Sequence, residues 1–180
     1  MCKIYSYVRV STIQQKVERQ INNIIGFNGD AIIISEKQSG KDIDNRAEFK
    51  KLLNKVKPGD TIIFDEVSRM SRNADEGFSL YMELLSKGIS LVFLKERHID
   101  TDEYKRRTQK HIEKVSSSNK KMDNLINGIL ELVAEFEQEN LKDNIRLAFE
   151  QAEHERQFLI KRVTEGKATS SKRQGRPEGS

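Results

Sequence analysis

The sequence has a single cysteine, Cys2, among its 180 residues. One cysteine excludes an internal disulfide, a zinc ribbon and any cluster of cysteine ligands. No run approaches the ~18 apolar residues that a membrane-spanning helix needs. The N-terminus also lacks an apolar signal-peptide core, because Arg9 and a polar stretch follow almost at once. These absences predict a cytoplasmic protein that does not enter a membrane.

Neither sign of charge dominates, since the sequence has 32 Lys and Arg and 28 Asp and Glu, for a formal charge of +4. The excess lies wholly in residues 161–180, and residues 1–160 hold 26 charges of each sign. The basic residues of this tail are Lys161, Arg162, Lys167, Lys172, Arg173 and Arg176. Such a tail suits a polyanion, either nucleic acid or an acidic membrane surface. A solvated tail that binds nothing explains the charge equally well.

Short apolar runs alternate with amphipathic stretches through the first 100 or so residues. The runs at 4–10, 31–35, 61–65 and 89–94 predict strands, and the stretches between them predict helices. Buried apolar strands alternating with helices predict an α/β fold with a mainly parallel, four- to five-stranded sheet flanked by helices. Functional groups in such a sheet gather beyond the carboxyl ends of the strands.

From residue 122 the apolar residues recur at spacings of three and four, which predicts one helix of about 40 residues and about 60 Å. This helix is longer than a core of this size, so the part that extends beyond the core needs a partner, either another subunit or DNA. Residues 100–121 are rich in Lys and Arg and predict a flexible connection. We expect an α/β domain at 1–121, the long helix at 122–166 and a basic linker tail at 167–180.

Arg9 and Ser11 stand at the carboxyl end of the first predicted strand. Strand alternation puts both side chains on the same side. A hydroxyl that attacks a phosphodiester needs cationic donors around the phosphate, and Arg9 could be one of them. The structural alternative is that Ser11 only caps the following helix.

Three further arginines could join this pair. Arg69 and Arg72 follow the strand at 61–65, and Arg46 follows the loop at Ser39. Each of these arginines could also have no role in a site. Arg69 and Arg72 could lie in a surface turn capped by Asn73, and Arg46 could be an exposed arginine at the start of a helix. Converging on one serine, the arginines would form a phosphate site, because each guanidinium donates two hydrogen bonds and stays charged.

The order of these segments resembles the catalytic domain of the serine recombinases, the resolvase and invertase family. The opening Tyr-x-Arg-Val-Ser-Thr pattern and an Arg-x-x-Arg cluster about 60 residues later are the specific part of the match. The matching residues are Tyr7-Val8-Arg9-Val10-Ser11-Thr12, Gln15, Gln20, Ser39-Gly40, Arg46, Ser68-Arg69-Met70-Ser71-Arg72, Ile99-Asp100-Thr101, Ala134-Glu135-Phe136-Glu137 and Gly175-Arg176-Pro177.

The resemblance implies an enzyme that cuts and rejoins DNA strands. Ser11 would attack the scissile phosphate, form a 5′-phosphoserine link and release a 3′-hydroxyl. The four arginines would bind the phosphate and stabilise the transition state, with Gln15, Gln20 and Ser39 in supporting positions. Because the covalent link conserves the energy of the broken bond, neither a metal nor another cofactor is implied.

The resemblance also implies partners. The long helix would form a homodimer on double-stranded DNA, and two dimers would join into a tetramer at synapsis. The dimerisation residues would be Ile126, Ile129, Val133 and Phe136. The six basic residues of the tail would contact DNA on the way to a recognition domain. Only three residues follow Gly-Arg-Pro, too few for a helix-turn-helix, so we expect a catalytic domain without its DNA reader.

Several positions depart from the family pattern. Ser68 stands where the family often has Asp, so a carboxylate role does not transfer to it. Glu36 stands where some members have Asp. Asp143 and Asn144 replace a frequent Glu-Arg pair on the long helix.

Two other functions remain open from the sequence. Asp65 and Glu66, at a strand end, could hold Mg²⁺ in a metal-dependent phosphoryl-transfer or signalling domain, although an acidic pair at a strand end is often simply solvated. A non-catalytic dimerisation module that kept the fold would instead make no covalent DNA adduct.

Overall fold

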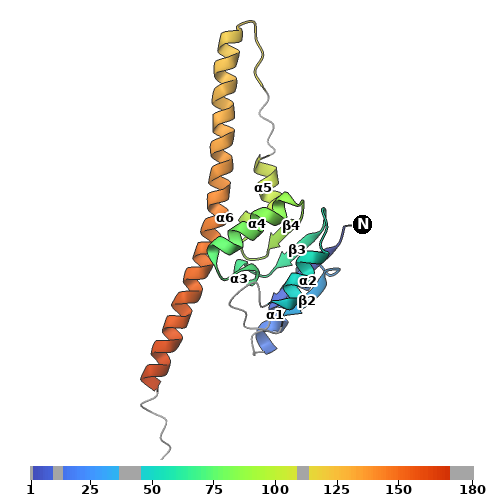
Figure 1. Cartoon of the computed structure of the whole chain (residues 1–180), viewed down its shortest axis with the longest axis vertical. Helices are drawn as coiled ribbons and strands as arrows, with labels where there is room; N and C mark the ends of the chain where they lie inside the picture. The colour runs from blue at the N-terminus through green and yellow to red at the C-terminus, as the bar shows by residue number, and fades with distance from the viewer. Residues whose placement is uncertain (1, 10–13, 37–45, 109–113, 171–180) are drawn as a thin grey trace, which may run out of the picture.

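The computed structural model describes residues 2–9, 14–36, 46–108 and 114–170. A four-stranded parallel sheet forms the centre of the α/β domain (Figure 1). The strands are β1 (Ile4–Arg9), β2 (Ile32–Glu36), β3 (Thr61–Phe64) and β4 (Ser90–Phe93). Their order is β2-β1-β3-β4, and every neighbouring pair is parallel. This confirms the predicted α/β class.

The helices cover both faces of this sheet. They are α1 (Gln14–Phe27), α2 (Ala47–Lys55), α3 (Val67–Met70), α4 (Ala74–Ser86), the 3-10 helix η2 (Arg97–Ile99), α5 (Thr101–Thr108) and α6 (Lys120–Ser170). Strand alternation sends Tyr5 and Tyr7 into the larger core, with side chains of α2, α4 and α6. Val8 points to the other face and packs with Ile24 of α1.

Strand β2 differs from its predicted environment. The run at 31–35 predicts a buried strand, but β2 is an edge strand and Ile32 is 45% exposed. An edge strand has a neighbour on one side only, so a continuous apolar run there stays partly open to solvent.

Helix α5 replaces part of the flexible connection expected at 100–121. Two acidic residues, Asp102 and Glu103, lie in its first turn, and Arg106 and Arg107 both bind the Glu103 carboxylate at 2.7 Å. Acidic residues near the N-terminus and basic residues one turn later stabilise a short helix, and this charge pattern outweighs the low apolar content.

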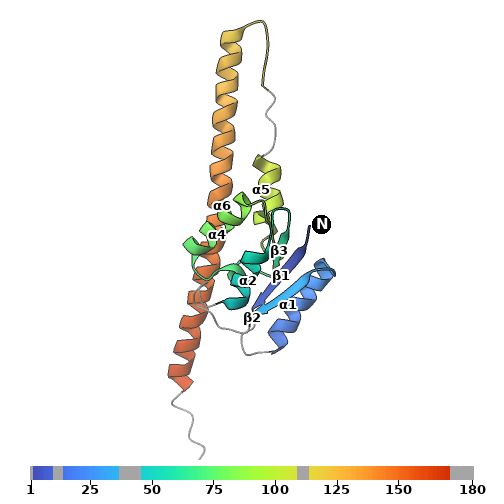
Figure 2. The same cartoon turned by 45° about the vertical axis from the view of Figure 1, so that its right-hand side comes forward.

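Helix α6 is longer than predicted, with 51 residues, or about 76 Å at 1.5 Å per residue. Figures 1 and 2 show its N-terminal part projecting beyond the sheet, with residues 114–119 running alongside it. Val115 and Asn127 exchange two hydrogen bonds, of 2.8 and 3.0 Å, that hold this segment on the helix. None of the described helices has an apolar stretch sufficient to cross a membrane.

The apolar residues of α6 form two faces instead of one stripe. Leu141, Ile145 and Phe149 are buried against the domain, whereas Ile129 is 52% exposed. The step from Ile129 to Ile145 is about 4.4 turns at 3.6 residues per turn, so these side chains point to nearly opposite sides. The sequence pattern alone had merged both sets into one stripe.

Candidate active site

The candidate site lies beyond the carboxyl ends of β1 and β3, which are neighbours in the sheet. Arg9 is the last residue of β1, and α3 follows β3 after two residues. Ser11 and Ser39 lie outside the described residues, as does the side chain of Gln15. Gln20 is described, and its side chain is buried on α1. The sheet topology thus brings the Arg9 end of β1 next to the Arg69 segment.

Arg9 is a buried cation held against α3. It is 6% exposed, and its Nη2 donates a hydrogen bond of 3.2 Å to the Ser68 carbonyl. Burial, followed by repulsion from Arg72, Arg69 and Arg46, lowers the pKa of Arg9 to about 9. Arg9 therefore stays charged at neutral pH in a position where a bound anion would relieve its repulsion.

Arg46 is also buried, at 2% exposure, in contrast to the exposed helix-start arginine that was its structural alternative. Its guanidinium donates to the carbonyls of Arg69 at 3.0 Å and Met70 at 2.6 Å. The same group lies 4.3 Å from the centroid of the Phe49 ring. Burial lowers its pKa, while the nearby Tyr7 hydroxyl acts in the opposite direction. Arg46 thereby ties the start of α2 to α3.

The segment around α3 carries Glu66, Ser68 and Arg69 close together. Glu66 Oε1 accepts a hydrogen bond of 2.5 Å from Ser68 Oγ and pairs with Arg69 Nη2 at 2.8 Å. Glu66 Oε2 pairs with Lys95. Burial raises the pKa of Glu66, but hydrogen bonds from Lys95 and Ser68 and the charge of Arg69 outweigh it and hold that pKa below its usual value.

Arg72 does not belong to the same helical turn as Arg69, because α3 ends at Met70 and Ser71 has extended backbone angles. Asn73 then begins α4, and its side chain accepts a hydrogen bond of 2.9 Å from the Glu76 amide, the cap that the sequence suggested. Arg72 lies in the short connection between α3 and α4.

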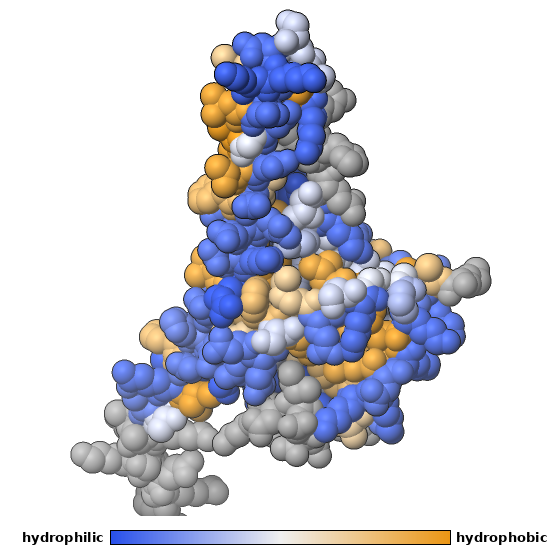
Figure 3. Space-filling model, turned by 45° about the horizontal axis from the view of Figure 1, so that its top comes forward, coloured by the Kyte–Doolittle hydropathy of each residue, from blue (hydrophilic) through white to orange (hydrophobic). Residues whose placement is uncertain are grey.

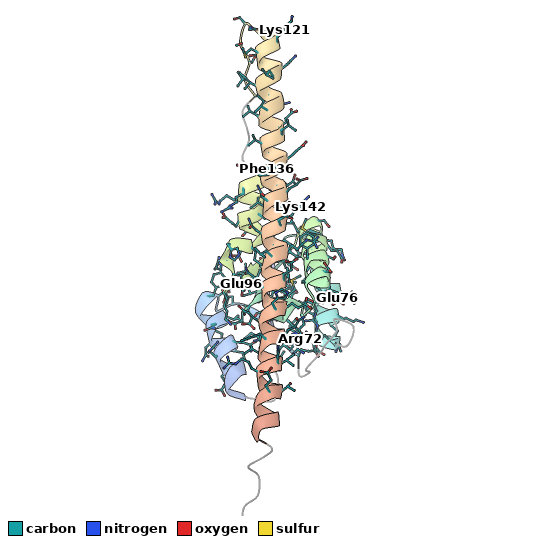
Figure 4. All side chains as sticks on the ribbon, turned by 90° about the vertical axis from the view of Figure 1, so that its left-hand side faces the viewer. Arg72, Glu76, Glu96, Lys121, Phe136 and Lys142 are labelled. Carbon is teal, nitrogen blue, oxygen red and sulfur yellow. The ribbon has the colours of Figure 1, made fainter. Side chains whose placement is uncertain are left out.

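A pocket of about 280 Å³ opens between this segment and α6. Its lining includes basic and acidic side chains from five separate segments of the chain. The lining residues are Arg9, Glu66, Ser68, Arg72, Glu96, Ala152, Glu155, Arg156 and Leu159. Figure 4 shows α6 crossing the part of the domain that carries Arg72, Glu76 and Glu96, with Lys121 and Phe136 on its projecting part.

Arg156 is the site residue that the sequence reasoning missed. It comes from α6, and its charge lowers the pKa of Arg72 after the larger effect of burial. The Nε atoms of Arg156 and Arg69 are buried and have no hydrogen-bond partner among the described residues. Arg156 follows Ala152 by four residues, so helical spacing from the packed face was the available signal.

Three carboxylates around the candidate site, those of Asp65, Glu66 and Glu36, already have partners. Asp65 accepts a hydrogen bond of 2.9 Å from Asn23 and lies 3.9 Å from Lys95, and Glu66 is held as described above. Glu36 accepts from the amides of Glu48 at 2.9 Å and Phe49 at 3.1 Å, so it caps α2. Among the described residues, no group of three or more His, Cys, Asp or Glu could hold a metal ion.

The arrangement as a whole can bind a phosphate group. Arg9, Arg72 and Arg156 reach one pocket from three separate segments. In the part of the chain that the structure describes, the buried Nε atoms of Arg69 and Arg156 have no hydrogen-bond partner. Guanidinium groups bind phosphate oxygens through pairs of hydrogen bonds and hold their charge when partly buried. Donors fixed in advance around a phosphate also stabilise the charge that develops during transfer.

Comparison with known proteins agrees with this geometry. Residues 4–155 match the family model described as "Resolvase, N terminal domain". The chain belongs to the resolvase family. Its segment from Arg9 to Arg72 therefore lies within the family's N-terminal domain.

Several relatives carry recombination names. The chain is 30% identical to the transposon Tn501 resolvase of Pseudomonas aeruginosa over 140 residues, covering 78% of this chain and 64% of that protein. It is 37% identical to the DNA-invertase hin of Salmonella typhimurium over 82 residues, covering 46% and 42%. The chain thus spans less than two thirds of the length of these relatives.

Two solved structures are similar at modest scores. The N-terminal catalytic domain of TP901-1 integrase has a TM-score of 0.45 and 22% identity, over 76% of this chain and 97% of that one. A resolvase family site-specific recombinase from Streptococcus pneumoniae has a TM-score of 0.43 and 25% identity, over 80% and 93%.

Three of the six residues expected to contact DNA belong to the C-terminal end of α6. Lys161 and Arg162 are exposed on the helix, and the Arg162 guanidinium lies 5.8 Å from the centroid of the Phe158 ring. Lys167 is in the last turns of α6, but its side chain is not described. Lys172, Arg173 and Arg176 lie outside the described residues.

Proposed function

We propose that this chain is the catalytic part of a site-specific DNA recombinase of the serine type. The observation that carries the proposal is the pocket in which Arg9, Arg72 and Arg156 meet, beside a strand whose continuation holds Ser11 two residues after Arg9. Membership of the resolvase family and the recombination names of the relatives support the same reaction class.

In the proposed reaction, the Ser11 hydroxyl oxygen attacks the scissile phosphorus. The bond between phosphorus and the 3′-oxygen breaks, and the departing oxygen takes a proton to become a 3′-hydroxyl. The 5′-phosphate stays linked to Ser11, so one phosphodiester bond replaces another and no hydrolysis is needed. Arg9 and Arg72 neutralise the phosphate oxygens as charge builds up, and the reverse reaction with a new 3′-hydroxyl rejoins the strand.

Arg46 has a different part in this proposal. Its donors are engaged with the backbone carbonyls of α3, so in this arrangement it holds the Arg69 segment in place. Gln15, Gln20 and Ser39 keep the supporting roles that the family resemblance implies.

The exposed apolar face of α6 supports self-association. Ile129, Val133 and Phe136 are 52%, 46% and 64% exposed, and Ile126 is partly buried. Figure 3 shows apolar side chains gathered on the projecting part of this helix. A second copy that packs its own α6 against this face would bury them and give the proposed homodimer. The tetramer at synapsis and the contact of the basic tail with double-stranded DNA belong to the same proposal.

The first prediction is a covalent adduct between Ser11 and DNA. The chain is joined to a DNA-recognition domain of known site and incubated with a nicked duplex that traps cleaved strands. We expect a denaturation-resistant adduct, located by mass spectrometry on the peptide that contains Ser11. Ser11→Ala should abolish it, because no oxygen nucleophile remains at that position.

Ser86→Ala is the matched control, because Ser86 is exposed and its hydroxyl bonds only to the Glu83 carbonyl. It should form the adduct at the wild-type rate. An adduct that survives Ser11→Ala contradicts the assignment. A wild-type chain that binds the duplex and dimerises without forming an adduct favours the non-catalytic dimerisation module.

A further inference from the structure

Glu66 carries three partners that meet on one carboxylate. Ser68 Oγ and Arg69 Nη2 both bind Oε1, at 2.5 and 2.8 Å, and Lys95 binds Oε2. Glu66 precedes α3 with extended backbone angles, so its side chain folds back over the first turn of that helix. The carboxylate is also part of the pocket wall with Arg9 and Arg72.

The pair of Glu66 and Arg69 is largely shielded from water. Their side chains are 21% and 22% exposed, unlike the exposed pair of Lys51 and Glu48. A shielded pair with a charge-assisted hydrogen bond fixes its geometry more firmly than an exposed pair. Glu66 holds Nη2 of Arg69. One edge of the Arg69 guanidinium is thus fixed, close enough to Arg9 and Arg72 for their charges to interact.

Helix α3 cannot fix the Arg69 side chain by itself. It has four residues, a length at which a helix depends on outside contacts. Its backbone is anchored by Arg9 at the Ser68 carbonyl and by Arg46 at the carbonyls of Arg69 and Met70. These bonds place the backbone but leave the Arg69 guanidinium undirected. Among the described residues, its one ion pair is with Glu66.

We propose that Glu66 is a positioning residue, which orients Arg69 toward the scissile phosphate while Lys95 balances its charge. The inference rests on the proposed function for the identity of the phosphate. The inference also explains how Ser68 can stand where the family often has Asp. The Ser68 hydroxyl donates a hydrogen bond to the Glu66 carboxylate, so Glu66 supplies the negative charge beside Arg69 in place of a carboxylate at residue 68.

The second prediction tests, without a catalytic assay, whether Glu66 orients the Arg69 guanidinium. Nitrogen–proton NMR of the arginine side chains is recorded on the full chain, with Arg69 assigned by substitution. In Glu66→Gln we expect the Arg69 guanidinium signals to shift and broaden, because the charged partner that restrains the group is lost. Glu83→Gln is the control, since it removes the same charge from an exposed pair with Lys87 and should leave Arg69 unchanged.

The same variants are then compared in the Ser11 adduct assay. Glu66→Gln should form the adduct about tenfold more slowly, since the lost orientation affects the transition state, with unchanged binding of the duplex. Combining Glu66→Gln with Ser68→Asp should restore both the rate and the NMR signals. Ser68 Oγ lies 2.5 Å from Glu66 Oε1, so a carboxylate at residue 68 would reach the same space.

The outcomes separate this inference from the proposed function. Unchanged Arg69 signals in Glu66→Gln overturn the inference even where the wild type forms its adduct. A wild-type cleavage rate in Glu66→Gln, or a double variant that stays at the Glu66→Gln level in both measurements, overturns it too. Failure of the wild type to form any adduct counts against the proposed function, and the NMR comparison still decides whether Glu66 orients Arg69.

Discussion

The two parts of α6 have similar helical backbones and opposite surroundings. Residues 141–156 pack against α3 and α4, whereas residues 120–140 project from the domain with Leu132 and Phe136 more than half exposed. In the packed part, apolar side chains complete the domain core and Arg156 reaches the candidate site. In the projecting part, apolar side chains are exposed. One continuous helix thus completes the domain core at one end and carries the surface of the proposed homodimer at the other.

The largest expected difference between the two parts concerns their phenylalanines. Phe149 is 2% exposed and packs edge-on against Phe93, whereas Phe136 is 64% exposed. Phe149→Ala should lower the free energy of unfolding by about 3–5 kcal/mol, because it leaves a cavity in the core. Phe136→Ala should change it by less than about 0.5 kcal/mol. Urea unfolding at low protein concentration measures both changes. Equal losses of unfolding free energy in the two variants would contradict the division of α6 into a packed part and a projecting part.

Replacing two glycines by alanine should change the stability of the fold by smaller amounts and in opposite directions. A Cβ added at Gly77 of α4 would lie 2.4 Å from the Phe149 ring, whereas a Cβ at Gly128 of α6 meets nothing within 4 Å. Gly77→Ala should destabilise the fold by about 1–3 kcal/mol through overpacking. Gly128→Ala should stabilise the helix by about 0.5–1 kcal/mol, because alanine loses less backbone entropy than glycine. Thermal unfolding of both variants measures this contrast, and a stabilising Gly77→Ala would show that α6 does not pack closely on α4.

The smallest effect on folding should come from a charge placed on the projecting part. Ile129→Asp and Val133→Asp should each change the unfolding free energy of the monomer by less than about 0.5 kcal/mol, since both side chains are exposed. Both should weaken self-association, because an unpaired carboxylate would be buried between two helices. Light scattering across a concentration series measures the association. Wild-type association in both variants would place the dimer contact elsewhere.

The strand pattern was the part of the fold that apolar runs predicted well. The runs at 4–10, 61–65 and 89–94 correspond to β1, β3 and β4 within one or two residues. The exposure of Ile32 was missed, because strand order is a property of the whole sheet and a run of isoleucines does not encode it. Helix α5 was missed because its stability comes from ion pairs around Glu103 rather than from apolar spacing.

The candidate site was predictable only in part. Arg9, Arg69 and Arg72 could be singled out because they follow strand ends, where a parallel sheet collects functional groups. Arg46 was singled out as well, although its burial and its bonds to α3 were not foreseen. Arg156 gave no comparable signal, because an arginine on a charged helix is common on protein surfaces. Glu66 was singled out only as a possible Mg²⁺ ligand, and its contact with Arg69 was not foreseen.

The sequence by itself determined the succession of strands and helices along the chain apart from α5, the parallel α/β class, the long helix and the family motif from Tyr7 to Thr12. These follow from local periodicity and from short patterns, which a single segment carries. Tertiary structure alone decided which side of α6 meets the domain and which charged residues share the pocket. Both sides of α6 carry apolar residues, and only packing against Gly77 and the core selects the side of Phe149. That choice of side brings Arg156 beside Arg72, because contacts between distant segments depend on the whole fold.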